Sequence, residues 1–81
     1  MVYKTKGVCS RDITFELDEN NKVHGIVFNG GCAGNTKGIA SLCEGMDASE
    51  VIKRLEGVPC GMKKTSCPDQ LAQALKLALN A

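Results

Sequence analysis

Cysteine is the residue type in this sequence with the clearest capacity for chemistry. The 81-residue chain contains five cysteines, and a cysteine thiolate can bind a metal ion or attack an electrophile. Cys43 shares a helical spacing with Ile39, Leu42 and Met46, which predicts a small buried side chain in the core. The other four are predicted to lie in loops or at the ends of elements: Cys9, Cys32, Cys60 and Cys67.

Cys67 has the most informative neighbours of these four. Pro68 suits the first position of a helix, because the N–H that proline lacks would have no partner there. Cys67 should therefore lie at or beside the N-cap, at the positive end of the helix dipole, which favours the thiolate. Lys63 and Lys64 are close by in the sequence and act in the same direction.

Four loop thiols are chemically suited to a metal site. Four thiolates complete the tetrahedral coordination that zinc prefers, and iron–sulfur clusters are held by the same ligands. The four cysteines are separated by 22, 27 and 6 residues, unlike the paired CxxC motifs of a zinc ribbon. They can meet only if the fold brings them together. The residues alone leave zinc, an iron–sulfur cluster and four unconnected reduced thiols open.

Composition favours a cytoplasmic location. No apolar run approaches the ~20 residues that a membrane span requires, and the first residues lack the apolar region of a signal peptide. Cytosolic thiols stay reduced, which disfavours a disulfide framework, and the odd number of cysteines agrees with this. Ten basic residues are scattered along a chain with 4% aromatic residues and a net charge of +1, so nucleic-acid binding is not expected.

Other candidate sites have weaker support. His24 is the only histidine and lies in a predicted strand, where a packed or solvated ring is more common than a metal ligand. The glycine-rich stretch 29–35 lacks the Lys-Ser/Thr ending of a phosphate-binding loop. No residue is predicted to be catalytic.

The N-terminal third predicts a small antiparallel sheet. Residues Val2 to Val8 mix β-branched and aromatic residues with lysines, which is typical of an edge strand. Alternating apolar residues predict a second strand from Asp12 to Asp18. A polar turn at 18–21 then leads into a third strand from Lys22 to Asn29.

The rest of the chain predicts three helices. The first covers about 35–45 and ends at a glycine, and the second covers 47–55 and starts with a predicted capping box between Asp47 and Glu50. The third starts at Pro68, and four residues at helical spacing predict its buried face: Leu71, Ala74, Leu75 and Ala78.

These elements predict one α+β domain over residues 1–81. We expect a three-stranded antiparallel sheet with about three helices packed on one face and the cysteine-bearing loops at one end. A chain of 8.6 kDa without tryptophan has a thin core, and domains of this size often add a metal, disulfides or a partner subunit.

The segment Thr65-Ser66-Cys67-Pro68-Asp69 spells the name of the TSCPD domain family, and the sequence resembles that family along nearly its whole length. The segments KGVCS, GGCAGN and GVPCGMKKTSCPDQLA carry the resemblance. It implies a bacterial domain that occurs as small free-standing proteins and at the C-terminus of adenosylcobalamin-dependent ribonucleotide reductases. Free-standing members are often labelled ribonucleoside-diphosphate reductase. This chain is too short to contain a reductase barrel, so we expect no activity from it alone.

The order of elements also resembles, more distantly, the U-type iron–sulfur cluster scaffolds. Cys9, Cys32 and Cys67 match the three cysteines of the scaffold. The chain departs from that pattern by having Ser66 where the scaffold has a histidine, and by having Cys60 in addition. A fourth thiolate leaves no open ligand position, which favours storage or a structural role over turnover.

Three hypotheses about function follow. The leading one is a cysteine-ligated metal-binding module that holds zinc or an iron–sulfur cluster through Cys9, Cys32, Cys60 and Cys67. The first alternative is an accessory, regulatory or thiol-redox module of ribonucleoside-diphosphate reductase, acting in DNA precursor synthesis through a disulfide between Cys60 and Cys67. The second alternative is a small interaction domain, with another protein as partner and incidental cysteines. The oligomeric state stays open.

Overall fold

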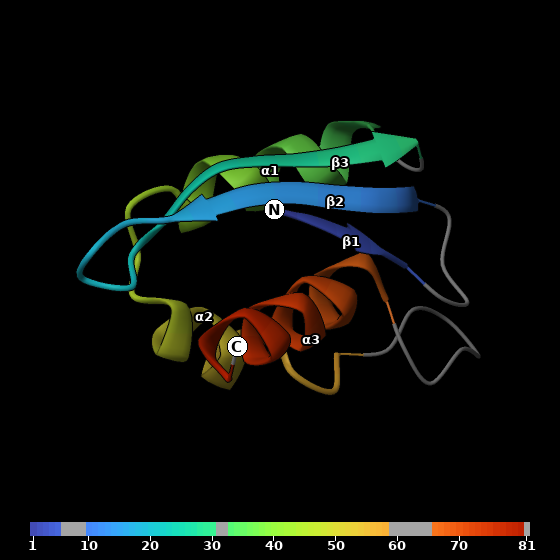
Figure 1. Ribbon diagram of the computed structural model, residues 1–81. Helices are drawn as coiled ribbons and strands as arrows, with labels where there is room; N and C mark the ends of the chain where they lie inside the picture. Colours follow the sequence, from blue (N-terminus) through green and yellow to red (C-terminus); the bar gives the residue numbers. More distant parts are fainter. Residues whose placement is uncertain (6–9, 31–32, 59–65, 81) are drawn as a thin grey trace.

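The computed structural model describes residues 1–5, 10–30, 33–58 and 66–80. Three strands come first in the chain and three helices follow, as expected for a small α+β domain (Figure 1). The elements are β1 (Val2–Lys4), β2 (Ser10–Leu17), β3 (Val23–Gly30), α1 (Ala33–Cys43), α2 (Ala48–Leu55) and α3 (Cys67–Leu79).

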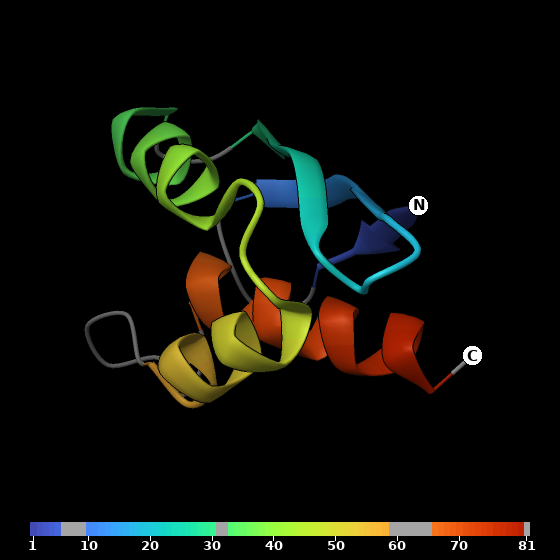
Figure 2. The ribbon, with the colours of Figure 1, turned by 90° about the vertical axis from the view of Figure 1, so that its left-hand side faces the viewer.

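The strands form one antiparallel sheet in the order β1-β2-β3. Tyr3, Ile13 and Phe28 are cross-strand partners, and all three contribute to the core on the side of the helices. Val2 and Val27 belong to the neighbouring cross-strand row and are 69% and 50% exposed, because alternate residues of a strand face opposite sides. Figure 2 shows α1 beside β3, and α2 and α3 below the sheet.

A bulge in β3 sets which of its residues enter the core. Thr14 pairs with Val27, but the next pair is Glu16 with His24, so β3 uses one residue more than β2 over this stretch. Gly25 lies there with φ +63°, a backbone conformation that glycine adopts at little cost. The extra residue places both Val23 and Ile26 in the core despite their odd spacing.

The core joins the sheet to all three helices. Six large side chains in it are less than 2% exposed, and they come from β2, β3, α2 and α3: Phe15, Ile13, Leu71, Leu75, Val23 and Val51. Cys43, the last residue of α1, is 6% exposed and belongs to the same cluster, which confirms that it is a core residue. Burial raises the pKa of the Cys43 thiol, so this sulfur is held in its unreactive neutral form.

Two details of the helices differ from the sequence-based predictions. Leu42 was expected on the buried face of α1 but is 79% exposed, because α1 packs mainly on β3 and so buries only a narrow stripe. The capping box predicted at the start of α2 is wrong, since Asp47 is the N-cap but makes no side-chain capping hydrogen bond. Glu50 instead accepts a 2.8 Å hydrogen bond from Arg54, one turn further along the helix.

The ends of the elements are also shifted slightly. The first helix is Ala33–Cys43 rather than 35–45, and β1 ends at Lys4. Thr5, which was predicted to continue this edge strand, lies outside it, and the last part of the prediction, 6–8, falls outside the described residues. Among the described residues, no helix has both the length and the apolar character that crossing a membrane requires.

Replacing Leu75 by alanine should lower the free energy of unfolding by about 2–5 kcal/mol, because truncating a fully buried leucine leaves a cavity. Leu77→Ala is the matched control on the same helix. Leu77 is 64% exposed, so its truncation should change the free energy of unfolding by less than about 0.5 kcal/mol. Urea unfolding followed by circular dichroism measures both. Equal losses would contradict the buried face assigned to α3.

Candidate functional site

The predicted cysteine ligands lie mostly outside the described residues. Cys67 is described, and it is the first residue of α3, with its side chain half-buried. Cys9, Cys32 and Cys60 are outside the described ranges. Within those ranges no group of three or more His, Cys, Asp or Glu side chains is arranged to hold a metal ion. The four-cysteine site therefore stays a prediction.

Ser66 forms the N-cap that orients Cys67. Its backbone is extended, with φ −150° and ψ 170°, and its Oγ accepts a 3.1 Å hydrogen bond from the Asp69 amide. The same hydroxyl donates a 2.6 Å hydrogen bond to the Val58 carbonyl. Pro68 is the second residue of α3, one position later than predicted, and it still lies in the first turn, where the N–H that proline lacks would have no partner. Cys67 thus starts a helix whose first turn is held in place by the two hydrogen bonds of the Ser66 hydroxyl.

Asp69 makes a second link between α3 and the segment that follows α2. The side chain is 7% exposed, and its Oδ1 accepts a 2.7 Å hydrogen bond from the Gly57 amide. Gln73, one turn along α3, lies 3.4 Å from the same oxygen through its Nε2. A buried carboxylate requires such donors, because losing its hydration shell is costly. Residues 57–58 and 66–69 are consequently joined on either side of the segment 59–65.

Gln70 connects the same turn of α3 to the sheet. It is 6% exposed, and its Oε1 accepts a 3.3 Å hydrogen bond from the Tyr3 hydroxyl of β1. Together with the contacts of Ser66 and Asp69, this places the first turn of α3 against both β1 and the end of α2. The sequence predicted the helix start, but nothing in it indicated these partners.

The described residues next to Cys9 and Cys32 also lie at this end of the sheet. Ser10, which follows Cys9, and Gly30, two residues before Cys32, are cross-strand partners in β2 and β3. Lys4, at the end of β1, pairs with Asp12 nearby. The starts of β2 and α3 and the end of β3 can be seen on the same side of Figure 1.

The family model of the TSCPD domain matches residues 1–79. This chain belongs to the TSCPD domain family. Searches of curated proteins and of solved structures found no match to it. In this TSCPD domain, the four described residues of the Thr65–Asp69 segment form the capped, anchored start of α3: Ser66, Cys67, Pro68 and Asp69.

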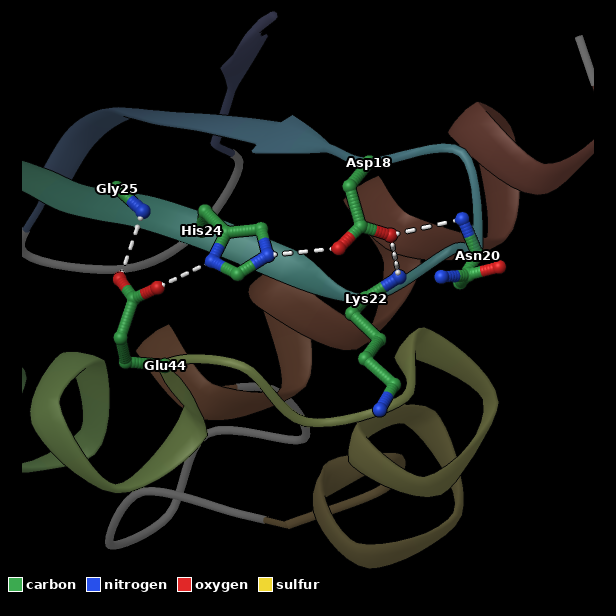
Figure 3. A network of polar contacts seen from close by, with 6 residues as sticks. All are labelled: Asp18, Asn20, Lys22, His24, Gly25 and Glu44. Carbon is green, nitrogen blue, oxygen red and sulfur yellow. Dashed lines mark hydrogen bonds and ion pairs between the residues drawn. The ribbon is translucent and has the colours of Figure 1, made fainter.

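A second polar cluster of the TSCPD domain surrounds His24, at the opposite end of β2 and β3 (Figure 3). The ring Nε2 lies 2.9 Å from Oδ2 of Asp18, and Nδ1 lies 2.5 Å from Oε2 of Glu44. His24 was expected to be a packed or solvated ring, whereas it bridges two carboxylates from separate segments. The proximity of Asp18 across a tight turn was a usable signal in the sequence, but Glu44 lies 20 residues away and could not be foreseen.

In this cluster the histidine and the two carboxylates each favour the charged form of the other. The contacts to Asp18 and then to Glu44 raise the pKa of His24 above its ordinary 6.5. The pKa of Asp18 is lowered first by the Lys22 amide and next by His24, and the pKa of Glu44 is lowered first by the Gly25 amide and next by His24. The two ring nitrogens face two different carboxylates, so the cluster has the geometry of an ion-pair bridge rather than of a metal site.

Ser66→Ala should lower the free energy of unfolding by about 1–2 kcal/mol, because it removes the N-cap acceptor and leaves the Val58 carbonyl without its 2.6 Å donor. Ser49→Ala is the control, since Ser49 is an exposed serine of α2. It should change the free energy of unfolding by less than about 0.5 kcal/mol. Thermal or urea unfolding measures both, and an unaffected Ser66→Ala variant would contradict the anchoring role of the cap.

Proposed function

We propose that this TSCPD domain is a cysteine-ligated metal-binding module that holds zinc or an iron–sulfur cluster, with Cys9, Cys32, Cys60 and Cys67 as ligands. One observation carries the proposal. The cross-strand pair Ser10–Gly30 and the anchored first turn of α3 lie at one end of the molecule, and each adjoins a cysteine-bearing segment. A metal site requires that these cysteines, which are far apart in the sequence, lie close together, and their spacing alone could not predict this.

Chain connectivity extends this support. Consecutive Cα atoms are about 3.8 Å apart, Cys9 is bonded to Ser10, and Cys32 is two residues beyond Gly30. Cys60 is likewise two residues beyond Val58, whose carbonyl is held by Ser66 next to Cys67. Short tethers from described anchor residues therefore limit how far each of the three cysteines can lie from this end.

The donor set fits the proposed metals. Four thiolates suit zinc at Zn–S distances of about 2.3 Å, and they equally suit the iron of a cluster. Cys43 is excluded as a ligand because it is buried in the core and neutral. Binding would also supplement a small core, since a structural zinc ion can contribute on the order of 10 kcal/mol to folding.

Protein purified without oxygen and analysed by inductively coupled plasma mass spectrometry should contain about one zinc ion, or the iron of one cluster, per chain. Serine substitution of each proposed ligand in turn should lower the metal content and the melting temperature: Cys9, Cys32, Cys60 and Cys67. Cys43→Ala is the matched control, and it should keep its metal while losing some stability. A fully folded, metal-free wild-type protein would overturn the proposal.

A thiol-redox role is the second candidate. It is favoured by two hydrogen bonds that join residues 57–58, which shortly precede Cys60, to residues 66–69, which include Cys67. In this role Cys60 and Cys67 would form a disulfide, giving two electrons and two protons to a disulfide acceptor. A ribonucleotide reductase, with which the sequence resemblance associates such domains, is the partner that we propose for the exchange.

Alkylation separates the two candidates. If the domain binds metal, its thiols should resist alkylation until a chelator is added. If it exchanges thiols, metal-free protein should instead show a reversible disulfide in a redox titration, and Cys60→Ser should abolish it. Cys43→Ala should leave either result unchanged, because that thiol is outside the proposed site.

A further inference from the structure

We propose that His24, Asp18 and Glu44 form a proton-operated latch that fastens the β2–β3 hairpin to the C-terminal end of α1. The latch closes when the imidazole carries two protons and opens when it loses one. It is independent of metal binding, because it lies at the end of β2 and β3 opposite to Ser10 and Gly30.

Hydrogen-bond geometry requires the doubly protonated ring. Both ring nitrogens lie within 2.9 Å of carboxylate oxygens, and an ionised carboxylate can only accept. A neutral imidazole has a single N–H, so one of its nitrogens would direct a lone pair at an oxygen lone pair. Only the imidazolium donates to Asp18 and to Glu44 at the same time.

The carboxylates are themselves held in their ionised form by backbone amides. Oδ1 of Asp18 accepts hydrogen bonds of 2.9 Å from the amides of Asn20 and Lys22. Oε1 of Glu44 accepts a 2.9 Å hydrogen bond from the Gly25 amide (Figure 3). These donors orient both side chains toward the ring and favour the ionised carboxylates. The protons in the contacts with Asp18 and Glu44 are therefore those of the imidazolium.

The latch joins two segments that also share backbone contacts. Glu44 directly follows α1, and the next residues hydrogen bond to the start of β3, with the Gly45 amide donating to Val23 at 2.7 Å and the Val23 amide donating to Met46 at 2.9 Å. The backbone contacts do not depend on protonation. Opening of the latch is therefore a local event, in which the Glu44 side chain and the His24 ring separate and the Gly25 amide loses its acceptor.

Acidic groups dominate the surroundings of the ring. From β2, Glu16 is the cross-strand partner of His24, and its carboxylate lies 3.1 Å from the N-terminal amine of Met1. From the turn come Asp18 and Lys22, and from the α1–α2 connection come Glu44 and Asp47, the bridge partner of Lys22. The carboxylates outnumber the cations, which favours the charged ring. Because the side chains are 36–50% exposed, salt weakens the latch.

The sign of the pH dependence follows from the direction of the shift. The pKa of His24 is raised in the folded protein relative to its ordinary 6.5. While Asp18 and Glu44 stay ionised, the stabilisation from the latch is therefore fully present below about pH 6.5, and it is lost as pH rises through the folded-state pKa of His24. Protonation closes the latch and deprotonation opens it, at a pH above the ordinary pKa of histidine.

A nuclear magnetic resonance titration of the full chain tests the latch directly. The His24 ring signals should titrate with a midpoint above that of an unstructured histidine peptide. Across the same midpoint, exchange of the Gly25 amide, corrected for intrinsic base catalysis, should accelerate by roughly threefold or more. The acceleration should be absent in His24→Gln. Adding salt should move the midpoint back toward the peptide value.

Asp18→Asn and Glu44→Gln should each lower the midpoint. Glu19→Gln is the matched control, because it removes the same charge from an exposed residue of the same turn and should leave the midpoint close to that of wild type. A wild-type midpoint at or below the peptide value would overturn the proposal, whatever the variants do. So would Gly25 exchange that does not follow the titration of His24.

Discussion

The anchoring of the first turn of α3 is the constraint on which the rest of this molecule depends. Asp69 and Gln70 are buried polar side chains, and each is satisfied by a partner from a distant part of the chain, Gly57 and Tyr3 respectively. Leaving either group buried without its partner would cost about 1–3 kcal/mol, a large share of the stability of a small domain. These contacts therefore specify one orientation of α3 relative to α2 and to the sheet.

The two polar networks act at opposite ends of β2 and β3. The network around Asp69 lies at the end where β2 starts and β3 finishes, and the network around His24 lies at the hairpin turn. Helix α1 extends between these ends, because it starts shortly after Gly30 and is followed at once by Glu44. The latch therefore acts beside the C-terminal end of α1 only, and its opening leaves the backbone contacts of that end in place.

Local sequence patterns predicted correctly which side chains are buried where a helix packs with one apolar face on the core. The stripe containing Leu71 and Leu75 is buried as expected, and Cys43 belongs to the core. The predictions were wrong where the packing of neighbouring elements decides whether a side chain is buried or hydrogen-bonded. Leu42 has the same spacing as its buried neighbours but lies on the open side of α1, and Asp47 is a suitable capping residue whose side chain makes no capping bond.

The order of strands and helices, the start of α3 near Cys67 and membership of the TSCPD family could all be predicted from the amino-acid sequence, because each depends on local runs of residues. Which polar groups meet could not be predicted, because the partners come from distant parts of the chain. Tyr3 and Gln70 are 67 residues apart in sequence, and their contact depends on strand register and helix packing. The contact between His24 and Glu44 likewise depends on the bulge at Gly25, since a shift of one residue would turn the ring to the other face of the sheet.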